Sequence, residues 1–175
     1  MHDTGSPSRA TVRSGGAARR CLDSPPGPGR ITGAELGFYL AVRSTGFAVH
    51  MSASQKHLRF VREMADKTLT AAGIAAALTE DVQLVASELI GNSVRHCGDL
   101  VPLVVEIDTG PAGVSVKVHD PDGENLPRRA AMPGVGAAQA ESGRGLPLVD
   151  LLAPGWVAAQ TPTGKQISCH LPFER

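Results

Sequence analysis

Three polar side chains recur at four-residue intervals in the stretch from residue 79 to residue 97: Glu88, Asn92 and His96. Residues four apart on an α-helix share one face, drifting by about 40° per step. A carboxylate there can polarise a water molecule or a hydroxyl group, and an amide oxygen is a hard ligand suited to Mg²⁺. The pattern also fits the solvated polar face of an amphipathic helix, and for this helix alone that interpretation is favoured.

A second polar segment, Asp120-Pro-Asp122-Gly123, directly follows an alternating apolar stretch that ends at His119. Carboxylates at the end of a strand can accept a hydrogen bond from an amino group such as that of adenine. An ordinary turn explains this segment better when it is taken alone.

A third segment, Ser142-Gly-Arg-Gly-Leu146, stands at the start of a predicted apolar helix. Glycines at such a place let backbone N–H groups approach phosphate oxygens, and the N-terminus of a helix favours negative charge. Gly-Arg-Gly ahead of an apolar helix is a more specific signal than a lone Gly-x-Gly.

Helices are predicted around these segments. In the central stretch, apolar residues at Val82, Val85 and Leu89 have helical spacing, with Thr79 as the expected cap and an acidic first turn behind it. Ser54 is expected to cap an earlier helix that runs to about residue 72. A third, short helix is predicted over residues 145–152.

Strands are predicted over residues 46–51, 101–108, 114–119, 156–160 and 166–171, because these runs alternate or are bounded by turn residues. The 120–145 segment is too long for an ordinary connection and is interpreted as a functional cover or a disordered loop. The order of elements predicts one layer of mixed or antiparallel sheet with helices on one face.

The first thirty residues differ in composition from the rest of the 175-residue chain. They hold five Arg against two Asp and nine Gly or Pro residues, with almost nothing apolar to bury. We expect residues 1–45 to be a disordered or poorly ordered extension, with 31–45 ambiguous between a short helix and a bridging segment, and residues 46–175 to form one domain.

Composition also limits localisation and partners. The three cysteines form no ligand pattern and the chain has no signal peptide or membrane-spanning run, so we expect a cytoplasmic protein that binds no membrane. The formal net charge is zero and the chain has only six aromatic residues, so nucleic-acid binding finds no support.

The motifs taken together, in order, resemble the Bergerat ATP-binding fold of histidine-kinase-like (GHKL) ATPases. Within it, the resemblance is closest to the stand-alone bacterial anti-sigma-factor serine/threonine kinases. It rests on Ser87-Glu-Leu-Ile-Gly-Asn-Ser-Val-Arg-His96, Asp120, Gly143-Arg-Gly-Leu-Pro-Leu-Val-Asp-Leu-Leu-Ala153, Trp156 and Gly164-Lys165. The fold that it implies is α+β, a two-layer sandwich of mixed sheet with helices on one face.

The resemblance also implies roles for individual residues. Glu88 would be the general base, and Asn92 would be a ligand of the Mg²⁺ that bridges the ATP phosphates. His96 would lie near the phosphates, and Asp120 would bind the adenine amino group. The remaining residues expected to bind the nucleotide are Asp122, Gly123, Gly143, Arg144, Gly145, Leu146 and Lys165.

Two departures from the family pattern fall near the expected nucleotide. Asp122 stands where Gly or Ser is common, and Gln166 stands where many relatives have a hydroxyl residue. Pro147 also replaces an aliphatic residue, although proline is tolerated in the first turn of a helix.

The function implied is a Mg²⁺-ATP-dependent kinase that phosphorylates a serine on an anti-anti-sigma (STAS-type) partner and sequesters a sigma factor. The alternative is a catalytically weak ATP-binding anti-sigma or signalling scaffold. A DNA-acting or chaperone ATPase is disfavoured because the chain has no second domain to drive. The family resemblance also makes a homodimer plausible.

Overall fold

The structure is a computed structural model that describes residues 30–35, 37–127 and 145–174. Its helices are α1 (Gln55–Ala71), α2 (Ala76–Cys97) and α3 (Gly145–Leu152). Its strands are β1 (Arg30–Glu35), β2 (Phe38–Val42), β3 (Gly46–Ser52), β4 (Pro102–Gly110), β5 (Gly113–Asp120), β6 (Val157–Thr161) and β7 (Gly164–Pro172).

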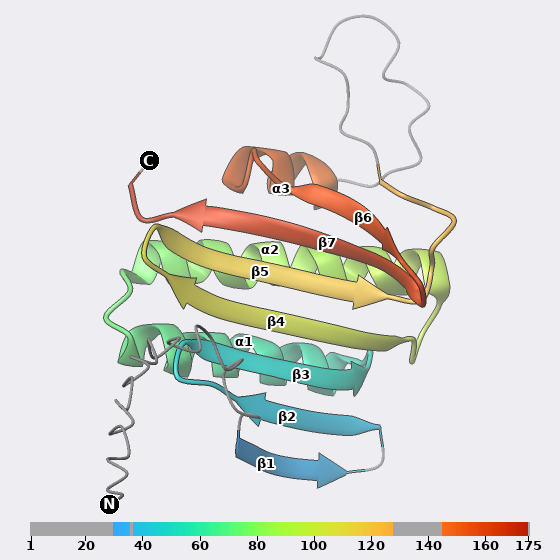
Figure 1. Ribbon diagram of the computed structural model, residues 1–175, viewed down its shortest axis with the longest axis horizontal. Helices are drawn as coiled ribbons and strands as arrows, with labels where there is room; N and C mark the ends of the chain where they lie inside the picture. The colour runs from blue at the N-terminus through green and yellow to red at the C-terminus, as the bar shows by residue number, and fades with distance from the viewer. Residues whose placement is uncertain (1–29, 36, 128–144, 175) are drawn as a thin grey trace, which may run out of the picture.

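The seven strands form one sheet in the order β1-β2-β3-β4-β5-β7-β6. Every pairing between the described strands is antiparallel, so the expected mixed sheet is in fact antiparallel. Figure 1 looks onto the open face of this sheet, with α1 and α2 running behind the strands. The expected α+β sandwich with helices on one face is confirmed.

The core lies between the helices and one face of the sheet. Alternation along β5 directs Val114, Val116 and Val118 toward the helices, and all three are buried. They meet the apolar stripe of α2, in which Val85 and Leu89 are fully buried. Each such side chain contributes about 1.5–3 kcal/mol on burial, so this layer fixes α2 against the sheet.

The predicted start and end of α1 are close to the observed ones. Ser54 is the N-cap, and its hydroxyl oxygen accepts a hydrogen bond of 3.2 Å from the backbone N–H of His57. Shortly after the last helical residue, Gly73 has a φ of +74°, which favours glycine and ends the helix.

The predicted start of α2 is wrong. The helix begins at Ala76, and Thr79 lies inside it, 3% exposed, instead of capping it. Glu80 is therefore beyond the first turn. The physical reason is the alanine run at residues 75–77, because alanine has the highest helix propensity and extends the helix past the candidate cap.

The expected domain boundary at residue 45 is also wrong for the described residues before it. β1 and β2 lie in the segment that was expected to be an extension, and β2 pairs with β3 along its whole length. Leu40 is 8% exposed and belongs to the core, while Phe38 packs edge-on against Phe60 of α1 with ring centroids 4.9 Å apart. The sheet therefore begins at residue 30, and residues 1–29 lie outside the described part of the chain.

Among the described helices, none combines the length and the apolar character that crossing a membrane requires.

Candidate active site

The C-terminal half of α2 carries the three polar residues singled out in the sequence, but they lie in different surroundings. Asn92 is 4% exposed, and its Oδ1 accepts a hydrogen bond of 3.5 Å from Arg95 Nη1. Glu88 is half-buried and His96 is exposed. Within the described part of the chain, the side chains of Glu88 and His96 make no hydrogen bond or ion pair. The Glu88 carboxylate is therefore uncommitted, one turn before a buried amide.

Ser93, which the sequence analysis did not single out, connects this helix to the sheet. Its hydroxyl donates to Asp120 Oδ2 at 2.6 Å and lies 3.2 Å from the Leu89 carbonyl oxygen, and the side chain is fully buried. The available signal was a hydroxyl residue on the apolar stripe of α2, four positions after Leu89. A polar residue in such a stripe needs a buried partner, and here the partner is Asp120.

The end of β5 and the start of β7 meet at a buried ionic cluster, which we call the Asp120–Lys165–Asp122 cluster. Lys165 Nζ lies 3.2 Å from Asp120 Oδ1 and 2.9 Å from Asp122 Oδ2. The side chains of Lys165 and Asp120 are 1% and 2% exposed, and that of Asp122 is 12% exposed. Asp120 Oδ1 also accepts the backbone N–H of Asp122 at 3.0 Å. Asp120 therefore accepts two hydrogen bonds from protein groups and forms an ion pair with Lys165.

The charges of this cluster support one another. The hydrogen bond from Lys165 lowers the pKa of Asp122 to about 2, and backbone and side-chain hydrogen bonds from Asn125 act in the same direction. A buried lysine is tolerated when it is paired, and here two carboxylates face one ammonium group. With all three groups ionised the cluster carries a formal charge of −1.

The Asp-Pro-Asp-Gly segment is both a turn and part of the site. Asp122 Oδ1 accepts the backbone N–H groups of Glu124 and Asn125 at 3.3 and 3.1 Å. The simple-turn interpretation and the functional one are thus compatible: one oxygen of Asp122 shapes the loop and the other pairs with Lys165.

Gly164 places Lys165 in this cluster. It has a φ of +147°, and a Cβ on this residue would lie 1.9 Å from the carbonyl oxygen of Asp120. Only glycine lets the start of β7 come so close to the end of β5. Gly123 lies on the other side of this contact, because a Cβ there would be 3.2 Å from the Gly164 carbonyl oxygen.

Gln166 faces away from the site, contrary to its expected position near the nucleotide. Side chains alternate along β7, so Lys165 and Ile167 point toward the helices while Gln166 points to the open face. Its Nε2 donates to Ser168 Oγ at 3.1 Å on that same face. The residue next to Asp120 is therefore Lys165, directly after Gly164.

The glycine-rich segment is described only in part. Gly143 and Arg144 lie outside the described residues, and Gly145 is the first residue of α3. Leu146 is 9% exposed and belongs to the hydrophobic core, where it helps to seat α3. Trp156, near the end of α3, is also a core residue, and its indole N–H donates to Asp150 Oδ1 at 2.7 Å.

Cys97 lies beside the cluster but has no sign of reactivity. Burial and the neighbouring Asp120 carboxylate raise the pKa of its thiol, so the neutral form is favoured. Reactive cysteines need the opposite shift.

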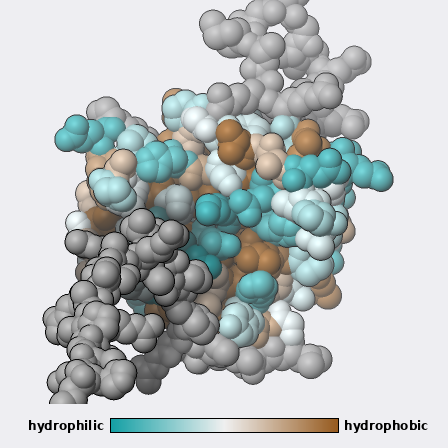
Figure 2. Space-filling model, in the orientation of Figure 1, coloured by the Kyte–Doolittle hydropathy of each residue, from teal (hydrophilic) through white to brown (hydrophobic). Residues whose placement is uncertain are grey.

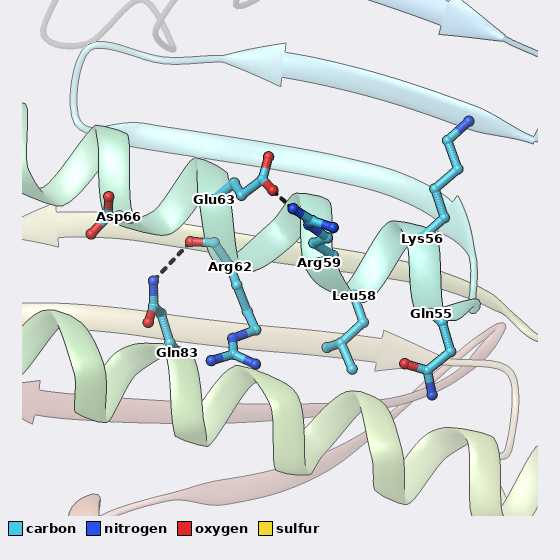
Figure 3. A pocket seen from close by; sticks show the side chains of 8 residues that line it. All are labelled: Gln55, Lys56, Leu58, Arg59, Arg62, Glu63, Asp66 and Gln83. Atoms are coloured by element: carbon cyan, nitrogen blue, oxygen red, sulfur yellow. Dashed lines mark hydrogen bonds and ion pairs between the residues drawn. The ribbon is translucent and has the colours of Figure 1, made fainter.

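Cavities among the described residues also lie outside this cluster. One of about 850 Å³ lies along α1 and α2, where Gln83 Nε2 donates to the Arg62 carbonyl oxygen at 2.9 Å and Arg59 pairs with Glu63 (Figure 3). Another, of about 520 Å³, lies on the open face of the sheet, which Figure 2 shows as a mixture of hydrophilic and hydrophobic residues. It includes His50 and His119 but none of the predicted site residues.

The residues present fit a magnesium ion held together with a phosphate chain. Mg²⁺ prefers oxygen ligands and commonly takes only one or two from protein, with phosphate and water supplying the others. Asn92 Oδ1 is such an oxygen, and the Glu88 carboxylate lies one turn away on the same helix.

Comparison with known proteins agrees with this architecture. Residues 51–169, well over half of the chain, match the family model for the histidine kinase-like ATPase domain. The chain is also 33% identical over 85 residues to an uncharacterized protein of Streptomyces coelicolor, an overlap of 48% of this chain and 78% of that protein. With its helix-backed sheet and the Asp120 site at one end of α2, the chain belongs to the ATP-binding family of histidine kinase-like ATPase domains.

Proposed function

We propose that this protein is a Mg²⁺-ATP-dependent serine/threonine kinase that phosphorylates a serine on an anti-anti-sigma (STAS-type) partner and sequesters a sigma factor. The supporting observation is the position of Glu88. Its half-buried carboxylate lies one turn before the buried Asn92, on a helix that the Ser93–Asp120 hydrogen bond ties to the sheet. A base needs such a fixed position because proton transfer requires hydrogen-bond geometry.

Each residue has a defined part in this proposal. Glu88 accepts the proton of the partner's serine hydroxyl, Asn92 Oδ1 is an oxygen ligand of Mg²⁺, and Asp120 accepts the amino group of adenine. Mg²⁺-ATP supplies the phosphoryl group and the charge neutralisation that its transfer requires. In this proposal His96, which is exposed one turn after Asn92, would lie near the phosphates.

The test is phosphotransfer from labelled ATP to a panel of STAS-type proteins, with ATP affinity measured in parallel. Glu88→Gln is expected to lower the transfer rate about 100-fold or more while ATP affinity changes less than about threefold. Glu80→Gln is the matched control, because Glu80 is an exposed carboxylate on the same helix. Equal losses of transfer and affinity in Glu88→Gln would rule out a base.

A catalytically weak ATP-binding scaffold is the second candidate, favoured by the Asp120–Lys165–Asp122 cluster. In this cluster protein groups already occupy much of the hydrogen-bonding capacity of Asp120. One pair of measurements distinguishes the two candidates. A scaffold captures a sigma factor in an ATP-dependent way that Glu88→Gln leaves unchanged, and the unmodified chain shows no phosphotransfer.

In either case we propose a cytoplasmic protein that acts as a homodimer. Light scattering of the purified chain tests the oligomeric state.

A further inference from the structure

Hydrogen-bonding capacity remains in the buried cluster at two neighbouring groups. An ammonium group has three N–H donors, and an ionised carboxylate has about four acceptor positions. Within the described residues, Lys165 Nζ contacts two carboxylate oxygens. Asp120 accepts hydrogen bonds from Ser93 and from the backbone N–H of Asp122, and its Oδ1 forms an ion pair with Lys165 Nζ. One donor on Lys165 and one acceptor on Asp120 Oδ2 are thus uncommitted.

These two groups are adjacent and almost inaccessible to solvent. Lys165 Nζ and Asp120 Oδ1 lie 3.2 Å apart, and their side chains are 1% and 2% exposed. An unpaired donor or acceptor in such a position carries a desolvation penalty. A ligand that offers one donor next to one acceptor relieves both.

Adenine offers this pair. Its exocyclic 6-amino group is a donor, and the neighbouring ring nitrogen N1 is an acceptor. Hypoxanthine has the opposite polarity at both positions, a carbonyl oxygen and an N–H. Guanine shares that reversal and matches a carboxylate and an ammonium group only in a shifted position.

We propose that Asp120 and Lys165 together read the base edge of ATP: Asp120 accepts the 6-amino group, and Lys165 donates to ring nitrogen N1. This inference rests on the proposed role of Asp120 and adds a second specificity-determining residue. Ser93 and the backbone N–H of Asp122 hold the carboxylate in place. Because the side chains of Asp120 and Lys165 are closed to solvent, the base reaches them by displacing the side chains that cover them. Asp122, which is 12% exposed, lies on the solvent side of the cluster.

The test is calorimetric titration of the full chain with ATP, 1-deaza-ATP (which has C–H in place of N1), purine riboside triphosphate (which lacks the amino group) and GTP. The unmodified chain is expected to bind ATP about 10- to 100-fold more tightly than 1-deaza-ATP, the size of one hydrogen bond to a charged group. In Lys165→Met this preference collapses to less than about threefold, whereas discrimination against purine riboside triphosphate persists through Asp120. Lys117→Met, on the open face of β5, keeps the original preference.

The outcomes separate the inference from the proposed function. Equal affinities of the unmodified chain for ATP and 1-deaza-ATP overturn the inference and leave ATP binding intact; this arm needs no variant to fold. Tighter ATP binding by Lys165→Met also overturns it, because the lysine then competes with the base for Asp120. Tighter binding of GTP than of ATP rejects adenine as the base. Binding of no purine nucleotide removes the proposed function itself.

Discussion

Ser93 donates a hydrogen bond of 2.6 Å to Asp120, and this contact joins the C-terminal part of α2 to the end of β5. Both side chains are buried, so Ser93→Ala leaves an acceptor of Asp120 unpaired. We expect this substitution to lower the free energy of unfolding by about 1–3 kcal/mol, measured by urea denaturation.

Ser87→Ala is the matched control for this prediction. Ser87 is a half-buried serine on the same helix whose hydroxyl donates only to the Gln83 carbonyl oxygen, one turn earlier. Its replacement is expected to change the free energy of unfolding by less than about 0.5 kcal/mol. Similar losses in the two variants would contradict a special role for the Ser93–Asp120 contact.

Gly164→Ala is expected to destabilise the protein by about 2–4 kcal/mol. The added methyl group would lie 1.9 Å from the Asp120 carbonyl oxygen, at a φ of +147° that disfavours alanine. Gly110→Ala is the comparison, because its Cβ would meet its nearest neighbour at an ordinary 3.7 Å. Thermal unfolding followed by circular dichroism measures both, and a stable Gly164→Ala variant would show that β5 and β7 tolerate separation here.

The stability of the protein is expected to depend on the ionisation of Asp122 in acid. The pKa of Asp122 is lowered from 3.8 to about 2 in the folded chain, chiefly by the hydrogen bond from Lys165. The folded state therefore binds this proton less readily than the unfolded state. Its contribution to stability is fully present above about pH 4 and is lost as the pH falls toward 2.

Asp122→Asn should flatten this part of the pH profile. The measurement is the urea midpoint at a series of pH values between 2 and 7. Asp66→Asn, at an exposed position on α1, is expected to keep the slope of the unmodified protein. An unchanged slope in Asp122→Asn would show that another group is responsible.

A chain that starts at Gly46 is expected to unfold at least about 10 °C below one that starts at Arg30, because the shorter chain lacks β1 and β2. It loses the buried Leu40 and the packing of Phe38 against Phe60, and it leaves β3 as an exposed edge. Differential scanning calorimetry of the two truncated chains tests this. Equal melting temperatures would support the boundary predicted from sequence.

Capping and alternation rules predicted the secondary structure correctly where a single sequence pattern was dominant. Ser54 identified the start of α1, and alternation identified β5, because capping and burial act within a few residues. They failed at the start of α2, where Thr79 matched a capping pattern but the preceding alanines continued the helix. They also failed for β1 and β2, whose strand character depends on the pairing of β1 with β2 and of β2 with β3.

Sequence patterns predicted the elements on which some candidate residues lie, but not the network that joins residues of different elements. The spacing of Glu88 and Asn92 placed both on α2, as observed. No spacing rule connects Ser93 or Lys165 with Asp120, since these residues meet only when α2, β5 and β7 pack together. Gln166 was noted only as a departure from the family pattern near the nucleotide, and alternation along β7 directs its side chain to the open face of the sheet.

The alternation along β7 has a consequence for how this protein can diverge. Lys165 and Gln166 are neighbours in the chain, yet one belongs to the buried cluster and the other to the open face. A substitution at position 165 therefore changes the buried cluster beside α2. A substitution at position 166 changes the exposed face of the sheet. The buried cluster and the exposed sheet can therefore change independently through adjacent codons.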